Sequence, residues 1–154
     1  MSLKSNRYFI LALSILMGCA QPRYVQETAA PELKANQGEV ADCSIKWSHS
    51  GLCLFWRWEK LPTGKQPGVL VFKSFRLSQL DNSPIESDLP GSASVVLWMP
   101  EMGHGSALTT TEKIDTGTYR SSNVFFLMPG KWEIKFDVKE NDIITESASV
   151  AITI

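Results

Sequence analysis

The stretch KWEIKFDV, residues 131–138, indicates the fold most clearly, because apolar and charged side chains alternate along it. One set of alternate positions is apolar and consists of Trp132, Ile134, Phe136 and Val138. The positions between them are charged and consist of Lys131, Glu133, Lys135 and Asp137. A period of two separates a buried face from a solvated face only in a β-strand. We therefore expect a strand over 131–139 with one face against a core.

The same alternation returns near the C-terminus, so a second strand is expected beside the first. Its apolar positions are Ala148, Val150, Ile152 and Ile154, and its other positions are Ser147, Ser149, Ala151 and Thr153. The residues between the two strands include Glu140-Asn141-Asp142, whose composition favours a turn. Upstream, residues 122–128 alternate as far as Pro129-Gly130, a pair suited to a type II turn. This pattern predicts a hairpin that joins 122–128 to 131–139.

Earlier parts of the chain repeat the strand pattern and contain no helical periodicity over the length of a typical helix. Further strands are expected at 43–48, 52–58, 68–79, 92–99 and 107–113, with Ser48–Gly51 turning the first into the second. About seven or eight short antiparallel strands predict an all-β domain, an immunoglobulin-like antiparallel β-sandwich. Of the five tryptophans, Trp56 and Trp58 share a face with Leu52 and Leu54. We expect at least one of these two tryptophans at the centre of the core.

The first 18 residues have the features of a bacterial lipoprotein signal peptide. Lys4 and Arg7 supply positive charge, and the apolar run from Tyr8 to Met17 follows. A helix over this run rises only about 15 Å, half of the roughly 30 Å that a hydrocarbon core requires. The sequence Leu16-Met17-Gly18-Cys19 resembles a lipobox, in which Cys19 carries the lipid. An ordinary secretory signal followed by a chance cysteine is the alternative.

These features predict where the mature protein lies and how it is divided. Ala20 occupies the position where a signal for retention in the inner membrane would place Asp, so we expect a periplasm-facing lipoprotein of the outer membrane. Residues 19–41 are polar and lack hydrophobic periodicity, as a flexible linker does. Residues 42–154 then form one domain.

The cysteines fit an exported protein, because lipidation of Cys19 leaves Cys43 and Cys53 as a pair. Two cysteines in an oxidising compartment usually form a disulfide, and their spacing matches no zinc motif. Two thiolate ligands for a metal are the alternative. The register raises a difficulty, since a turn at 48–51 sets Lys46 rather than Cys43 opposite Cys53. Cys43 must therefore approach diagonally or from an irregular segment.

Charge and motifs argue against two classes of function. Without the signal peptide the chain keeps 13 basic and 16 acidic residues, a net charge of −3, whereas nucleic-acid-binding domains usually carry a basic surface. The chain has no nucleophile-elbow frame and no glycine-rich phosphate loop. A single carboxylate, Glu101, beside His104 is a common chance arrangement. We expect a protein that is not an enzyme.

The stretch LWMPEMGHG, residues 97–105, contains the strongest candidate site. Thioether and imidazole ligands favour the soft ion copper(I). We expect a copper(I) site of Met99, Met102 and His104, with Met128 as a fourth ligand. Trp98 is a candidate for a π contact with the cation. His49, by contrast, is expected to be an exposed turn residue.

Two alternatives to the copper site remain open. Met99 and Met128 continue the apolar faces of their strands, and methionine fills irregular gaps in cores. In that interpretation His104 is a polar loop residue that bonds to the backbone. The loop is otherwise a docking surface for another envelope protein.

Taken together, the motifs resemble those of the FixH/YtkA-like family of exported or membrane-anchored β-sandwich proteins. The resemblance rests on VVLWMPEMGHGS at 95–106 and on TGTYRSSNVFFLMPGKWEIKFDV at 116–138, and it covers residues 90–154 best. It implies a β-sandwich similar to proteins found near respiratory oxidases and copper-handling systems, and it implies no enzymatic activity. Membrane-anchored members of the family use a transmembrane helix, whereas a lipid on Cys19 is expected here.

Overall fold

The computed structural model describes residues 43–154, which form nine β-strands and no helix. The signal peptide, the linker and the lipidation site at Cys19 lie outside the described residues. Within 43–154, no helix is long and apolar enough to cross a membrane.

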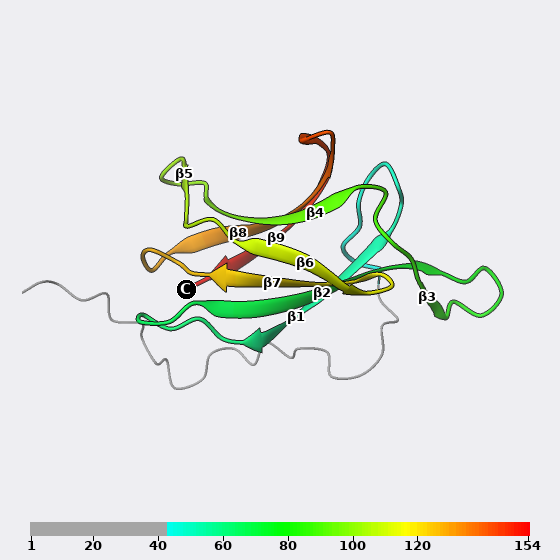
Figure 1. Cartoon of the computed structure of the whole chain (residues 1–154), viewed down its shortest axis with the longest axis horizontal. Helices are drawn as coiled ribbons and strands as arrows, with labels where there is room; N and C mark the ends of the chain where they lie inside the picture. The colour runs from blue at the N-terminus through cyan, green and yellow to red at the C-terminus, as the bar shows by residue number, and fades with distance from the viewer. Residues whose placement is uncertain (1–42) are drawn as a thin grey trace, which may run out of the picture.

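The strands form two antiparallel sheets that lie as two layers, one above the other (Figure 1). The first sheet has the order β1-β2-β7-β6 and contains β1 (Cys53–Lys60), β2 (Gly68–Leu77), β6 (Thr110–Asp115) and β7 (Thr118–Val124). A short β3 (Pro84–Glu86) pairs with β2. The second sheet has the order β5-β4-β8-β9 and contains β4 (Ser92–Met99), β5 (His104–Gly105), β8 (Lys131–Glu140) and β9 (Ile143–Thr153). The predicted fold, an immunoglobulin-like antiparallel β-sandwich, is confirmed.

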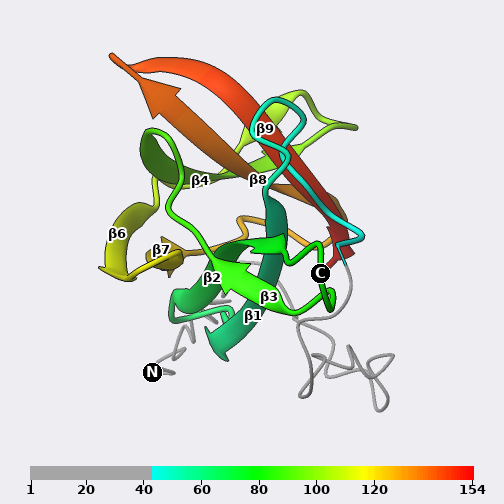
Figure 2. The same ribbon diagram turned by 90° about the vertical axis from the view of Figure 1, so that its right-hand side faces the viewer.

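The core lies between the two sheets, where their apolar faces meet (Figure 2). Phe136 of β8 meets Phe72 of β2 edge to face, with ring centroids 5.0 Å apart. The alternation of residues 131–138 is visible in the burial of β8, whose four apolar side chains are all buried. Burial of aromatic rings from both layers supplies the main driving force for joining the sheets.

The expected hairpin between 122–128 and 131–139 is wrong, because β7 and β8 belong to different sheets. β7 ends at Val124, after a bulge at which Asn123 takes a φ of 59°. The chain then crosses from the first sheet to the second. Val124 and Phe126 are fully buried along this passage, so their apolar character reflects burial at the crossing rather than one continuous strand.

The two tryptophans at the centre of the core are also different from those expected. Trp56 and Trp58 are only half-buried and pack against the core from β1, which is an edge strand. The fully buried tryptophans are Trp47 and Trp132. An edge strand leaves part of each large ring open to solvent, because no further strand covers its outer side.

The Cys43–Cys53 disulfide is confirmed, with 5.0 Å between the two Cα atoms. The expected strand over 43–48 is wrong, since only Lys46 of this segment forms a bridge, and its partner is Cys53. Cys43 therefore reaches Cys53 from an irregular segment, as the register required. The predicted turn at Ser48–Gly51 is also confirmed, and the side chain of His49 is exposed within it.

Other strand bounds differ from the predicted ones by a few residues. The strand expected at 107–113 begins at Thr110 and ends at Asp115. The short strands β3 and β5 were not predicted from the sequence. The turn between β8 and β9 is a tight one in which Asn141 and Asp142 have φ values of 52° and 63°. Two residues with positive φ match the type I′ geometry that suits a β-hairpin.

Candidate functional site

The turn at residues 100–103 brings His104 next to Met99. The Gly103 N–H donates a hydrogen bond of 2.9 Å to the carbonyl oxygen of Met99, and Gly103 adopts the positive φ of 67° that this turn requires. The chain returns as β5, where His104 pairs directly with Met99. Directly opposed residues of two strands share a face. His104 therefore lies on the side of the sheet that carries the buried Met99.

Trp132 connects this pair to a second predicted ligand. Its ring lies 6.2 Å from the His104 ring, centroid to centroid, in an edge-to-face arrangement. Its indole Nε1 donates a hydrogen bond of 3.0 Å to the carbonyl oxygen of Met128, and the half-buried Met128 side chain packs against the core. We call Met99, His104, Met128, Gly130 and Trp132 the Trp132 cluster.

Gly130 completes the Trp132 cluster by leaving space for Met99. A Cβ atom at position 130 would lie 2.3 Å from the Cε atom of Met99, so the end of the Met99 side chain lies directly against the Gly130 backbone. This contact places the thioether of Met99 beside the segment that begins at Met128. Met99, His104 and the backbone of Met128 are thus linked through Trp132 and Gly130.

The hydrogen bond between His104 and Gly105 indicates which nitrogen of the neutral imidazole carries the proton. Nδ1 lies 3.0 Å from the carbonyl oxygen of Gly105. A carbonyl oxygen only accepts hydrogen bonds, so Nδ1 must carry the proton in this contact. Nε2 then holds the lone pair of the neutral imidazole, which is the form that coordinates metals.

We do not count Met102 and Trp98 in the Trp132 cluster, although the Met102 N–H donates a hydrogen bond of 3.2 Å to the carbonyl oxygen of Met99. The Met102 side chain is 60% exposed on the turn. The Trp98 ring has the Nζ atom of Lys135 at 5.3 Å from its centroid, so its cation contact is with a lysine. Trp132, rather than Trp98, is the tryptophan beside the histidine. Sequence reasoning assigned Trp132 only to the core, because its proximity to His104 arises from the pairing of β4 with β8 and β5.

The donor atoms of the Trp132 cluster are two thioether sulfurs and one imidazole nitrogen. These soft donors fit copper(I) and do not fit the oxygen-seeking ions magnesium and calcium. No group of three or more His, Cys, Asp or Glu side chains in residues 43–154 is arranged to hold a metal ion.

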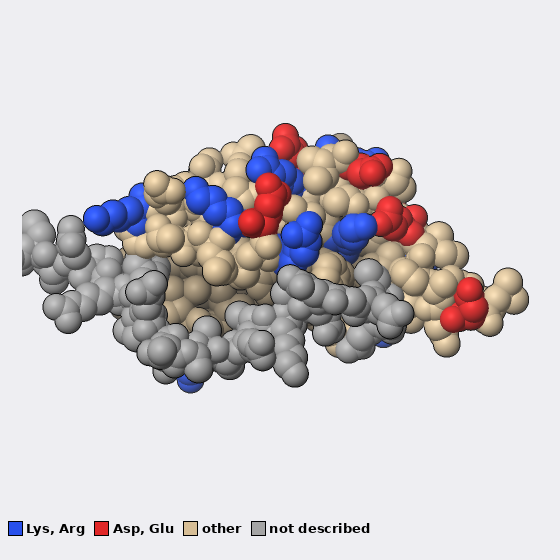
Figure 3. Space-filling model, turned by 90° about the horizontal axis from the view of Figure 1, so that it is seen from below, with Lys and Arg blue, Asp and Glu red and all other residues tan. Residues whose placement is uncertain are grey.

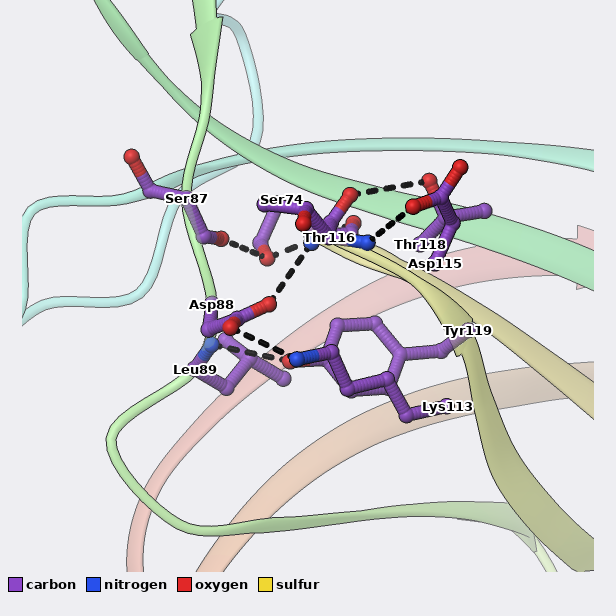
Figure 4. Close-up of polar contacts among 10 residues, drawn as sticks. Ser74, Ser87, Asp88, Leu89, Lys113, Asp115, Thr116, Thr118 and Tyr119 are labelled. Atoms are coloured by element: carbon purple, nitrogen blue, oxygen red, sulfur yellow. Dashed lines mark hydrogen bonds and ion pairs between the residues drawn. The ribbon is translucent and has the colours of Figure 1, made fainter.

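A second location with polar groups is a cavity of about 320 Å³ between the segment before β4 and the strands β6 and β7. Asp88 accepts a hydrogen bond of 2.8 Å from the Gly117 N–H and pairs with the Lys113 ammonium at 2.6 Å. The Tyr119 hydroxyl accepts a hydrogen bond of 2.9 Å from the Leu89 N–H. Figure 4 shows these groups bonded to one another. They fasten the segment before β4 to the β6–β7 turn, which is a structural role.

The charges of Asp88 and Lys113 stabilise each other. The Gly117 N–H, and after it the Lys113 ammonium, lower the pKa of Asp88. Asp88 in turn raises the pKa of Lys113. Both side chains are about half exposed, so solvent screens much of their attraction.

Basic and acidic side chains also alternate on the outer surface of the first sheet. Arg120 of β7 donates two hydrogen bonds, of 2.9 and 3.0 Å, to the carboxylate of Glu59 on β1. Its other contact is Glu112 at 3.7 Å. Figure 3 shows lysine and arginine side chains next to aspartate and glutamate rather than in a patch of one sign. Charges of mixed sign are typical of a solvated face.

Comparisons of the chain with protein-family models, with curated proteins and with solved structures find no match. The resemblance to FixH/YtkA-like proteins therefore stays a prediction that rests on the two motifs at 95–106 and 116–138.

Proposed function

We propose that the protein is a lipid-anchored β-sandwich of the cell envelope that binds copper(I) and holds or relays it. The proposed ligands are Met99, His104 and Met128. The observation that supports this proposal best is the pairing of His104 with the buried Met99, with the imidazole ring beside Trp132. The motifs that resemble FixH/YtkA-like proteins agree with a role near copper-handling systems.

Each residue of the Trp132 cluster has a distinct part in the proposal. The two methionines supply sulfur, and Nε2 of His104 supplies nitrogen. The Trp132 ring lies beside His104, where a contact of its π face with a desolvated cation would be worth up to about 2 kcal/mol. Gly130 keeps the Met99 side chain in place. The exposed Met102 is not required, so it provides a matched control.

Copper(I) affinity of the variants tests the proposal. We would titrate the purified full-length chain anaerobically in competition with a chromogenic chelator, using Cys19→Ser to remove the expected lipid. His104→Ala and Met128→Ala should each weaken binding at least tenfold, about 1.4 kcal/mol. Met102→Ala should leave the affinity nearly unchanged. Absence of binding by the parent chain, or equal affinities for all variants, would reject the copper site.

Lipidation is tested separately, because Cys19 lies outside the described residues. Cells labelled with a radioactive fatty acid should incorporate label into the parent chain and not into Cys19→Ser. Fractionation should then place the parent chain with the outer membrane. Equal labelling of the two chains would show that Leu16-Met17-Gly18-Cys19 does not act as a lipobox.

A protein-interaction module without a metal is the second candidate. Its support is the exposure of two apolar side chains whose chain neighbours belong to or adjoin the Trp132 cluster, since Met102 is 60% exposed and Leu127 is 49% exposed. A partner that covers this end of the sandwich would bury both side chains. If the parent chain binds no copper(I), this candidate takes its place. Neither candidate includes catalysis.

A further inference from the structure

Within residues 43–154, nothing pairs with the outer edge of β9 over the segment 147–153. β9 is the last strand of the second sheet, and its only strand partner in this part of the chain is β8. The turn at 48–50 covers only the first part of this strand, where His49 Nδ1 lies 3.0 Å from the carbonyl oxygen of Thr145 and the Ser50 N–H donates to Glu146. Beyond this point, no hydrogen bond from the described residues reaches the outer side of the strand backbone.

The segment 147–153 lacks the features that usually protect an edge strand. Proteins place charged side chains, especially lysine, or proline on exposed edges, and so prevent pairing with other chains. The sequence here is SASVAIT, without charge or proline. The two edge strands of the first sheet do carry charges, as the sequences CLFWRWEK of β1 and TTEKID of β6 show.

The composition of the free segment suits pairing with itself. In an antiparallel pair centred on Val150, the small Ala148 of one copy faces the large Ile152 of the other. On the opposite face, the hydroxyl of Ser147 meets that of Thr153. Cross-strand pairs of this kind stabilise a sheet. No two like charges meet, because the segment has none.

The burial of the same residues agrees with this arrangement. Val150, Ile152 and Ile154 are only half-buried although they pack against the core. A second copy would cover their exposed parts with its own equivalent side chains. We propose that β9 pairs antiparallel with β9 of a second copy of this chain, which joins two four-stranded sheets into one continuous sheet.

Symmetry limits the proposed assembly to a dimer. The same patch of β9 is used by both copies, so a contact of this kind closes after two chains. The paired segment is short, and its contact area lies below that of a standard stable interface, about 1,600 Å². We therefore expect a weak dimer whose population depends on protein concentration.

Charge substitutions on the exposed face of the segment test the proposal without reference to its exact register. One variant carries Ser149→Lys with Ala151→Lys, and the other carries Ser149→Glu with Ala151→Glu; both positions are exposed. We would measure sedimentation velocity of the full-length chain with Cys19→Ser over a wide range of concentration. The parent chain should dimerise, and each variant alone should self-associate at least tenfold more weakly, about 1.4 kcal/mol. An equimolar mixture should form a heterodimer, because opposite charges then face each other.

Sedimentation can overturn the proposal in two ways. One is a parent chain that stays monomeric at every concentration, and the other is dimerisation of both charged variants as strong as that of the parent chain. Hydrogen exchange of the parent chain tests the same pairing without any substitution. Protection of the amides of 147–153 should rise with concentration, whereas exchange independent of concentration would also overturn the proposal. None of these substitutions touches the proposed copper ligands, so the two proposals fail or succeed independently.

Discussion

Gly130 controls the position of Met99, because any side chain at position 130 would meet the Met99 methyl group. A Cβ atom there would lie 2.3 Å from Cε, and the φ of 144° is one that other residues rarely adopt. We expect Gly130→Ala to destabilise the fold by about 1–3 kcal/mol and to weaken copper(I) binding. Urea denaturation and the chelator competition measure the two effects.

Gly103→Ala is the matched control for this substitution. Gly103 also has a positive φ, of 67°, but nothing lies within 4 Å of an added Cβ. Its replacement should cost only backbone strain, about 1–2 kcal/mol, and should leave the copper affinity closer to that of the parent chain. Equal effects of the two substitutions on affinity would show that the Met99–Gly130 contact does not organise the site.

Asp88 should make the fold sensitive to acid. The Gly117 N–H and the Lys113 ammonium lower its pKa below the ordinary 3.8. The folded carboxylate binds protons less readily than the unfolded one, so its stabilising effect is present above about pH 3.8 and is lost as the pH falls below it. Asp88→Asn cannot titrate, and its stability should therefore fall less between pH 6 and pH 3. Urea midpoints at the two pH values measure this, and equal losses in both chains would contradict it.

For single residues, the sequence predicted the kind of chemical group better than it predicted where that group lies in the fold. Met99 and His104 were correctly placed near each other, because only a short turn separates them. The exposure of Met102 depends on how that turn is bonded, which residue spacing does not specify. Trp47 is fully buried, and its indole Nε1 donates a hydrogen bond of 2.9 Å to the carbonyl oxygen of Phe136. No local pattern indicates a contact between residues so far apart in the chain.

At the scale of single elements, the strength of alternation decided which strands were predictable. β4 was placed correctly, and β8 to within a residue, because apolar and polar side chains alternate along the core-facing part of each. β7 was placed four residues too late because its core-facing side includes the polar Ser121, which is fully buried and accepts a hydrogen bond from Thr111. A hydroxyl satisfied inside the core interrupts the apolar pattern. β5 has only two residues, too few for any period.

The disulfide should stabilise the element that precedes β1. Cys43 and Cys53 close a loop with a sequence separation of 10, and the loop contains the buried Trp47. A chain-entropy argument gives about 3 kcal/mol for a loop of this length. Replacing both cysteines by serine should lower the free energy of unfolding by that amount, as measured by urea denaturation. Reductant should lower the midpoint of the parent chain and leave the double variant unchanged; a parent chain indifferent to reductant would contradict this.

At the scale of the whole molecule, one core serves both sheets, and the edges of the sheets differ in how they are protected. The edge strands β1 and β6 of the first sheet carry charges, whereas the segment 147–153 of β9 carries none. The Trp132 cluster lies at one end of this core, so the copper(I) ligands would depend on the packing of both layers. A site made of the buried Met99 and the half-buried Met128 would therefore couple metal binding to the stability of the sandwich.

Phe136 tests whether the two sheets unfold as a unit. Its ring is fully buried and contacts Phe72 and Trp56 of the opposite sheet. Phe136→Ala removes these contacts and leaves a cavity, so we expect a loss of about 3–5 kcal/mol. Ile143→Ala, at a position that is 69% exposed, should change stability by no more than about 0.5 kcal/mol. Tryptophan fluorescence reports on both sheets, and circular dichroism reports on all strands, so their urea midpoints should coincide in both variants. Separate midpoints, or a small loss for Phe136→Ala, would show that the sheets are held together by something other than this shared core.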